Sequence, residues 1–413
     1  MRFCNYPYLH RTLDGDTPKR RLVYAAWFYS ISPLIMEKLT EDKHIRALDG
    51  LRALAILLVL MAHFTPTHDS NKGIRSLFFK VADMGWSGVD LFFVLSGFLI
   101  TGILLKGKAE GKPIRHYLVR RVLRILPAYY AALILVFLLI PLASNAYSAP
   151  SLFIQAPYWL YLSNMFPASY ESLAGMFNMS HFWSLALEMQ FYALLPIVIY
   201  RLSTEPALKI CALALAFSLL CRVVAVSLDA HWTITFGWLP MRLDGLVVGS
   251  MIALAIHKGI TYARMRTILL VVLCGSLGIL AMVAWNDMAG ALYKGRDYSL
   301  SWLVLRVTLP TIVVLFYGAV LWLSLQSNRF TRFLSCRHFA PMARYSYGTY
   351  IIHYLVEPVF LKWFGPNNLK PWTGGEDLPI YLYFVLASSM SFVLAMMCYH
   401  LIEKRFLLLK SRF

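Results

Sequence analysis

Long apolar segments recur along the whole chain, and their length constrains the fold more than any other feature. A helix of about 20 apolar residues spans the hydrocarbon core of a bilayer. Hydrophobic residues make up 59% of the chain, a share that soluble domains rarely reach. We therefore predict an all-α fold, a polytopic membrane helical bundle of about ten transmembrane helices. The predicted spans are 46–64, 84–105, 122–142, 182–201, 208–228, 235–257, 267–285, 303–325, 345–363 and 379–402, with a weaker, interfacial or re-entrant run at 152–166.

The distribution of basic residues gives the predicted bundle an orientation. Most of the 39 Lys and Arg residues lie at the chain ends and in the loops on one side of the spans. Because cytoplasmic loops carry such an excess, we predict that both termini are cytoplasmic. The formal net charge of +18 then reflects topology and the lipid bilayer, and it does not require a nucleic-acid partner.

Residues 1–45 precede the first span and form a segment of their own. The stretch "KRRLVYAAWFYSISPLIM" starts like a signal peptide, but Pro33 interrupts it and no small-residue cleavage site follows. We predict a cytoplasmic or interfacial segment. We also hypothesise that the native start is Met36, which N-terminal sequencing of the natively expressed protein would test. Residues 46–405 are the predicted transmembrane domain, and 406–413 are a cytoplasmic tail.

The first span, "RALDGLRALAILLVLMAHF", contains Arg52 and His63 in an otherwise apolar helix. Their offset of eleven residues turns a helix by about 1100° and raises it by about 16 Å, so both side chains face one side at different depths. Intramembrane ionisable residues usually face the bundle interior or a wet cavity. A guanidinium near the cytoplasmic end suits phosphate recognition, and an imidazole at the outer end suits proton abstraction from a hydroxyl. A proton relay and a satisfied core histidine are the alternatives.

Two further stretches predict side chains in the same cavity. "YLVRRVLRILPAYY" places Arg121 and Arg124 on one face of a helix that starts at the cytoplasmic side, whereas we interpret Arg120 as a topology anchor. "HFWSLALEMQFYALLP" opens a span from the outer side and holds Glu188 about one turn inside, where a carboxylate can orient a histidine or bind a sugar hydroxyl. Structural ion pairing is the alternative for every buried charge, including Arg222, Arg242 and Asp244. No histidine or cysteine cluster has metal-ligand spacing, so we expect no metal.

Five motifs in order, covering the chain from about Arg46 to Arg405, resemble those of the acyltransferase-3 family of integral-membrane O-acyltransferases. They are "LDGLRALAILLVLMAH" with Arg52 and His63, "GWSGVDLFFVLSGFLIT" with Asp90, "RRVLRILPAYY" with Arg121 and Arg124, "FWSLALEMQFYALLP" with Trp183, Ser184 and Glu188, and "YSYGTYIIH" with Tyr350 and His353. Each motif alone is weak, and their shared order makes the resemblance specific.

The resemblance implies acyl transfer from cytoplasmic acyl-CoA, usually acetyl-CoA, to a hydroxyl of an extracytoplasmic acceptor. We expect a cell-envelope or exported polysaccharide sugar as acceptor and the bacterial inner membrane as location; acylation of a small molecule such as a macrolide is the alternative. Many relatives carry a fused extracytoplasmic SGNH-type domain. The sequence ends at Phe413, shortly after its last span, so we expect either direct transfer or a separate extracytoplasmic transferase.

The resemblance also implies roles for individual residues. We expect Arg52, Arg121 and Arg124 to bind acyl-CoA, and His63 to act as general base or, alternatively, as a transient acyl carrier. Asp90 or Glu188 would orient the imidazole or contact the sugar. The predicted substrate-binding residues are Trp183, Ser184, Tyr350 and His353. A transporter or flippase without chemistry, and a scaffold subunit in which these charges are structural, remain the rival interpretations.

Overall fold

The computed structural model describes residues 44–65, 74–143, 148–166, 177–285, 300–375 and 377–410, and every regular element in these ranges is a helix. Nine of the described helices are long and apolar enough to cross a membrane. The prediction of an all-α polytopic membrane bundle is therefore confirmed. The predicted N-terminal segment with its candidate start at Met36 lies outside the described residues, apart from its last two positions.

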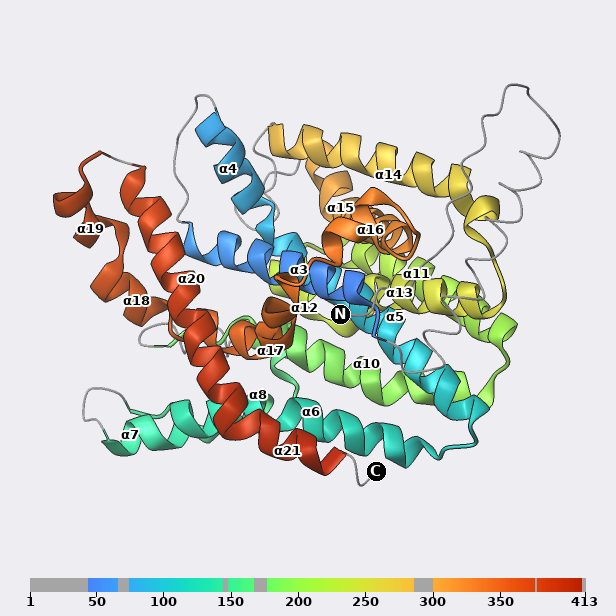
Figure 1. Ribbon diagram of the computed structural model, residues 1–413, viewed down its shortest axis with the longest axis horizontal. Coiled ribbons are helices and arrows are strands. Elements are labelled where there is room, and N and C mark those ends of the chain that lie inside the picture. Colours follow the sequence, from blue (N-terminus) through green and yellow to red (C-terminus); the bar gives the residue numbers. More distant parts are fainter. Residues whose placement is uncertain are drawn as a thin grey trace, which may run out of the picture.

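Figure 1 shows the elements in chain order, with colours running from blue to red. The long helices are α3 (Arg46–Phe64), α5 (Gly88–Ala109), α6 (Ile114–Ile134), α10 (Phe182–Arg201), α11 (Thr204–Ser227), α13 (Leu239–His257), α14 (Tyr262–Trp285), α15 (Leu300–Ser324), α17 (Phe339–Leu355) and α20 (Leu378–Cys398). Shorter helices are α4 (Ile74–Asp83), α7 (Ile140–Ala143), α8 (Leu152–Trp159), α12 (Trp232–Gly237), α16 (Arg329–Leu334), α18 (Glu357–Phe364), α19 (Pro366–Thr373) and α21 (Lys404–Leu409). The 3₁₀ turns are Gly85–Ser87 and Ser163–Met165, and π-helical turns at Leu135–Leu139 and Tyr399–Glu403 continue α6 into α7 and α20 into α21.

The predicted span 345–363 is divided between α17 and α18. Pro358 has no amide hydrogen to donate, and its ring clashes with the carbonyl group four residues earlier, so α17 cannot continue through this position. The helix ends before Val356, and α18 begins at Glu357 with Pro358 in its first turn. The second part of this predicted span is consequently the short helix α18, which the short helix α19 follows beyond the span, rather than the continuation of one spanning helix.

Helices α5 and α13 cross closely at the centre of the bundle because both carry glycine at the contact. A Cβ atom on Gly97 would lie 1.9 Å from the carbonyl oxygen of Leu246, and one on Gly249 would lie 2.0 Å from that of Val94. Small residues let membrane helices approach backbone to backbone. The pair Gly245 and Gly249 is therefore used within the chain, where it packs against α5.

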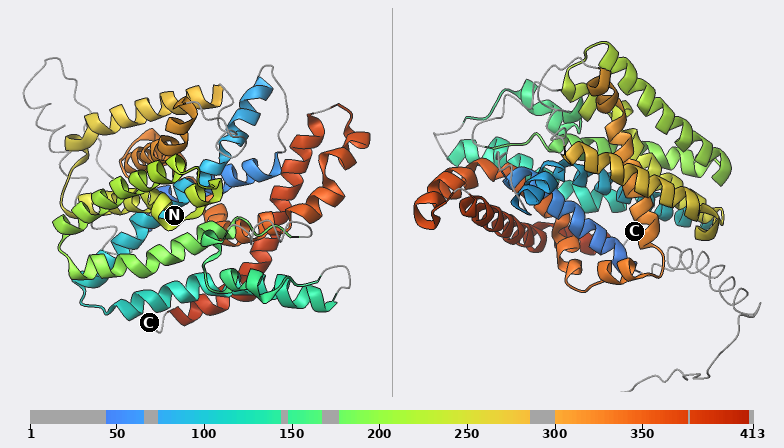
Figure 2. Two further views of the ribbon diagram at one scale, coloured as in Figure 1. Left: turned by 180° about the vertical axis from the view of Figure 1, so that it is seen from behind. Right: turned by 90° about the horizontal axis from the view of Figure 1, so that it is seen from above.

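The other helices are arranged around this crossing. Figures 1 and 2 show α14 on the outside of the bundle and α21 alongside α6, with the short helices α7, α18 and α19 at the opposite end from the α5–α6 connection. Helix α3 packs against both α5 and α17, and α10 packs against α5. This arrangement brings α3, α5, α6, α10 and α17 around one shared interior space.

Candidate functional site

A basic vestibule opens at the end of the bundle where α5 ends and α6 begins. Its volume is about 660 Å³. The one carboxylate among the described lining residues, Glu110, pairs with Lys112 at 2.6 Å and with Lys106 at 3.8 Å. The other basic side chains in the lining are Arg52, His116, Arg120, Arg121, Arg124 and Lys410. The vestibule therefore suits an anionic ligand.

A smaller inner cavity of about 140 Å³ follows the vestibule and shares Arg52, Arg121 and Arg124 with it. The structure thus brings together the three arginines that the sequence predicted to bind the donor. Arg121 also lies over the rings of Tyr117 and Tyr192, at 5.8 and 5.9 Å from their centroids. Because the three arginines line both spaces, they form the passage from one to the other.

The order of residues along the helices gives the inner cavity a depth. On α5, Lys106 lines the vestibule, Ser96 lines the inner cavity, and Phe92 lies about 6 Å farther along the helix. On α10, Tyr200 lines the vestibule, while Glu188 and then Ser184 lie progressively deeper. The arginines therefore stand at the near end of the cavity, Phe92, Ser184 and Tyr350 lie deeper, and Val89 lies one turn beyond Phe92.

Glu188 lies in the middle of the inner cavity. It accepts a hydrogen bond from the Ser96 hydroxyl, and the charges of Arg121 and Arg52 act on it. A carboxylate held by a hydroxyl beside two guanidinium groups is oriented toward the arginine end of the cavity. Among the described residues, Glu188 thus interacts with Ser96 and Tyr192 through hydrogen bonds and with Arg121 and Arg52 through their charge, but not with the imidazole of His63 that the sequence proposed.

Three histidines gather beyond the far end of the inner cavity. Nε2 of His353 lies 3.2 Å from Nδ1 of His63, and the centroid of the His181 ring lies 5.2 Å from that of His353. The ring of Tyr354 packs against His63 with a centroid distance of 4.1 Å. The structure therefore joins two sequence-predicted residues, His63 and His353, into one contact. His181, which no role was assigned to, completes the cluster.

Backbone carbonyls decide which ring nitrogens carry protons in this cluster. Nδ1 of His353 lies 2.7 Å from the carbonyl oxygen of Tyr350, which can only accept, so this nitrogen donates and Nε2 keeps its lone pair. Nδ1 of His63 lies 2.9 Å from the carbonyl oxygen of Val59 and must likewise donate. Nε2 of His63 is therefore the basic nitrogen of the half-buried ring.

His181 is held neutral just before α10. Burial in the bundle lowers the pKa of its ring to about 3, so the ring stays uncharged at neutral pH. Its Nε2 lies 3.0 Å from the carbonyl oxygen of Ile351 and donates to it, whereas the buried Nδ1 has no hydrogen-bond partner among the residues that the structure describes. His181 can consequently offer one lone pair inside the cluster.

Tyr350 and Ser184 separate the inner cavity from the histidines. Their hydroxyl groups are 2.6 Å apart, and the carbonyl oxygen of His181 lies 3.0 Å from the Ser184 hydroxyl and 3.3 Å from the Tyr350 hydroxyl. Because each hydroxyl has one proton, one of the two donates to the other and the second donates to the carbonyl. The ring of Tyr350 lines the cavity on one side and stands 5.5 Å, centroid to centroid, from the ring of His353 on the other. One side chain thus lies between the donor-side cavity and the histidine cluster.

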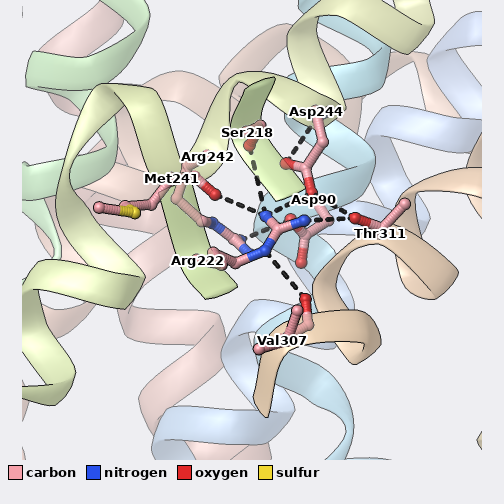
Figure 3. A network of polar contacts seen from close by, with 9 residues as sticks. Asp90, Ser218, Arg222, Met241, Arg242, Asp244, Val307 and Thr311 are labelled. Carbon is pink, nitrogen blue, oxygen red and sulfur yellow. Dashed lines mark hydrogen bonds and ion pairs between the residues drawn. The ribbon is translucent and has the colours of Figure 1, made fainter. Parts of the chain in front are cut away.

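Asp90 lies beside this path in a closed charge network with Arg242, Arg222 and Asp244, which Figure 3 shows. Asp90 pairs with Arg242 at 2.5 Å, Asp244 pairs with Arg222 at 2.8 Å, and all four side chains are fully buried. Trp183 packs over the Arg242 guanidinium at 5.9 Å. The geometry corresponds to the structural ion pairing that the sequence left open for Asp90, and it shows no contact between Asp90 and His63 among the described residues.

Some residues of the site carried no usable sequence signal. Glu403 has a buried oxygen that meets no hydrogen-bond partner in the described part of the chain, and the charge of Arg124 acts on this carboxyl group. It faces inward because it lies on the π-helical turn at Tyr399–Glu403, and the local sequence does not predict this turn.

Arg120 lines the vestibule as well, although its position next to a helix start equally fits a topology anchor. Among the described residues, no group of His, Cys, Asp and Glu could hold a metal ion.

The chain matches a known protein family and several named relatives. A family model described as an acyltransferase domain matches residues 45–400. The O-acetyltransferase OatA of Staphylococcus aureus is 24% identical over 389 residues, covering 89% of this chain and 58% of the relative. The putative peptidoglycan O-acetyltransferase YrhL of Bacillus subtilis is 28% identical over 394 residues, with 89% and 55% coverage. The peptidoglycan O-acetyltransferase OatA of Listeria monocytogenes is 32% identical over 165 residues, with 37% and 24% coverage.

The aligned region covers only part of the length of these relatives. The chain spans a little more than half the length of the Staphylococcus and Bacillus proteins. No solved structure matches the chain.

Proposed function

Because the chain belongs to this acyltransferase family, we propose that it is an O-acetyltransferase that moves an acetyl group from acyl-CoA to a hydroxyl of a cell-envelope glycan. The observation that carries the proposal is a single path. It leads from the basic vestibule, past Arg52, Arg121 and Arg124, into the inner cavity and ends at Ser184 and Tyr350, on whose other side the histidine cluster lies. The chain would act in the bacterial cytoplasmic membrane, with the vestibule facing the cytoplasm.

Acyl-CoA fits the donor end because its charge and its acyl group are separated by a long arm. Its phosphates suit the vestibule cations and the arginines, which present planar, bidentate donors. The uncharged thioester end then reaches the inner cavity, where Ser96 and Glu188 are the polar groups at mid-depth. No metal or redox group is required by this transfer, and the described residues supply the acid–base chemistry themselves.

The proposed reaction is one acyl transfer. The acceptor hydroxyl oxygen attacks the thioester carbonyl carbon, and Nε2 of His63 takes the hydroxyl proton. The carbon–sulfur bond breaks, and the proton passes from His63 to the departing sulfur, which yields the acetyl ester and the free CoA thiol. His353 is a positioning residue, because its contact with Nδ1 keeps the basic nitrogen of His63 free to face the acceptor.

The relatives suggest which glycan supplies the hydroxyl. Two of the three are named as acting on peptidoglycan, a polymer outside the cytoplasmic membrane. We propose a peptidoglycan sugar hydroxyl as the acceptor, reached from the histidine end of the path. Glu188 would contact the donor in the inner cavity, and Ser184 and Tyr350 would hold the thioester carbonyl where the acceptor hydroxyl can attack it.

Reconstituted protein tests this proposal. We expect liposomes that contain the full chain to transfer radiolabel from acetyl-CoA on one face to soluble peptidoglycan strands on the other. His63→Ala should lower the transfer rate by about 10²-fold to 10⁴-fold, the range for removal of a general base. His400→Ala is the matched control, because His400 is exposed and lies away from the path; its rate should equal that of the wild type.

The same assay separates the rival interpretations. A transporter or flippase would move a substrate without consuming acetyl-CoA, and a scaffold subunit would do neither. If label never leaves CoA, or if His63→Ala transfers label at the wild-type rate, the proposed mechanism is wrong.

A further inference from the structure

One face of α5 forms the apolar wall of the inner cavity. Val89, Phe92, Phe93 and Ser96 all line it, a spacing that places them on one side of a helix. Ser96 is the polar member nearest the arginines, and Phe92 lies about one turn deeper. A group that enters past the arginines therefore meets Ser96 first and the Phe92 ring afterwards.

Well-held side chains narrow the deep half of the cavity, where Val89 lies one turn beyond Phe92. The ring centroid of Phe92 lies 6.1 Å from that of Tyr350, whose hydroxyl is fixed by Ser184. Phe93 beside it packs edge-on against Trp183 at 6.0 Å, and its Cβ lies 2.8 Å from the position that a Cβ on Gly245 would take. Because these neighbours are tightly packed, Phe92 and Phe93 cannot move away from the cavity unless the surrounding side chains repack.

The cavity is small in comparison with acyl chains. Its volume of about 140 Å³ is close to that of an engineered protein cavity of about 150 Å³ that holds one benzene molecule. An acetyl thioester with the two methylene groups that follow its sulfur has as many heavy atoms as benzene. Each further pair of methylene groups would have to displace the Phe92 wall.

We propose that Phe92 sets the acyl-chain length of the donor, so that acetyl thioesters are accepted and hexanoyl or longer thioesters are excluded. The inference rests on the proposed function, since it assigns the inner cavity to the acyl end of acyl-CoA. Phe92 acts as a specificity-determining residue and takes no part in proton transfer. The half-buried ring occupies the space that a longer chain would need.

Donor competition tests the proposal. Purified full-length protein is loaded with radiolabelled acetyl-CoA, which is then displaced by unlabelled acetyl-, butyryl-, hexanoyl- and octanoyl-CoA. We expect wild-type affinity to fall from acetyl to hexanoyl, and Phe92→Ala to raise the affinity for hexanoyl-CoA relative to acetyl-CoA by about tenfold or more, as expected for apolar groups newly fitted into a pocket. Phe92→Leu should give an intermediate profile and keeps the site filled if the alanine variant folds poorly.

Phe384→Ala is the matched control. Phe384 is also a half-buried phenylalanine packed against the same hydrophobic cluster, but it does not line the cavity, so its variant should keep the wild-type chain-length profile. Equal wild-type affinities for acetyl- and hexanoyl-CoA would overturn the inference, and so would an unchanged profile in both Phe92 variants. If no acyl-CoA displaces the label or binds at all, the proposed donor itself is wrong, a result that is distinct from acetyl-CoA binding without chain-length selection.

Discussion

Two groups of arginines lie inside this bundle, and they differ in what surrounds their charge. Arg222 and Arg242 each meet an aspartate in a closed network without solvent access. Arg121 and Arg124 are half-buried, line a cavity, and have no carboxylate oxygen within ion-pair distance among the described residues. The partner of an intramembrane arginine, rather than its depth, therefore separates a structural charge from one that can bind a ligand.

The closed network gives the largest expected effect on stability. Asp244→Asn removes the negative partner of Arg222 and leaves its guanidinium charge buried without compensation. The free energy of unfolding should fall by about 3–5 kcal/mol, as measured by denaturation with SDS in mixed micelles.

A double variant checks the cause of that loss. Arg222→Met combined with Asp244→Leu removes both charges and fills the space with apolar side chains, so it should recover most of the stability lost in Asp244→Asn. A single variant as stable as the wild type would show that the network does not balance the Arg222 charge, and the distinction between the two groups would fail.

The open group should respond in the opposite manner. Arg124→Gln removes a cation that faces Arg52 and Arg121 in the cavity, and the three like charges repel one another. We expect the KM for acetyl-CoA to rise by about tenfold to hundredfold, because a hydrogen bond to a charged group contributes about 1.5–3 kcal/mol. The unfolding free energy should stay equal to or above that of the wild type. A loss of stability without a change in KM would assign Arg124 to the structural class.

The helical spans could be predicted because the bilayer leaves few ways to satisfy backbone hydrogen bonds in a long apolar segment. Arg52 and His63 were linked from periodicity alone, because an offset of eleven residues returns to nearly the same face of a helix. The donor-side group of Arg52, Arg121 and Arg124 followed from the family motifs. In each case the information was local in sequence or was carried by a recognisable pattern.

The sequence could not assign partners across the bundle. Asp90 and Glu188 looked equivalent as buried carboxylates, yet Asp90 faces Arg242 on α13 while Glu188 faces Ser96 on α5. The contact between His63 and His353 joins two residues that are 290 positions apart in the sequence. Such pairings depend on helix rotation and crossing, which the close approach at Gly97 and Gly249 sets and a single sequence does not reveal.

A conservative change refines the comparison at Arg52. Arg52→Lys keeps the positive charge but loses the planar, two-pronged geometry that suits phosphate. Its nearest acid, Asp49, lies 3.7 Å away, so the guanidinium is only loosely paired. We expect the KM for acetyl-CoA to rise about fivefold, which corresponds to one net hydrogen bond of about 1 kcal/mol. An unchanged KM would remove Arg52 from the donor site and leave it with the structural charges.

Arg120 provides the smallest and most discriminating test, because it belongs to neither group by sequence. It lines the vestibule, which opens to solvent, and it can act only through a screened charge or as a topology anchor. If it attracts the donor, Arg120→Gln should raise the KM about twofold in dilute buffer, and the difference should vanish near 1 M salt, where the Debye length falls to about 3 Å. Arg115→Gln is the control, since Arg115 is an exposed cation of the same helix outside the vestibule lining.

The effect of Arg124→Gln on the KM should persist at the same salt concentration, because the Arg124 side chain is half-buried beside the cavity. Equal salt dependence for Arg120→Gln and Arg124→Gln would mean that the vestibule and the inner cavity hold the donor in the same way, whereas no effect of Arg120→Gln at any salt concentration would leave Arg120 as a topology anchor.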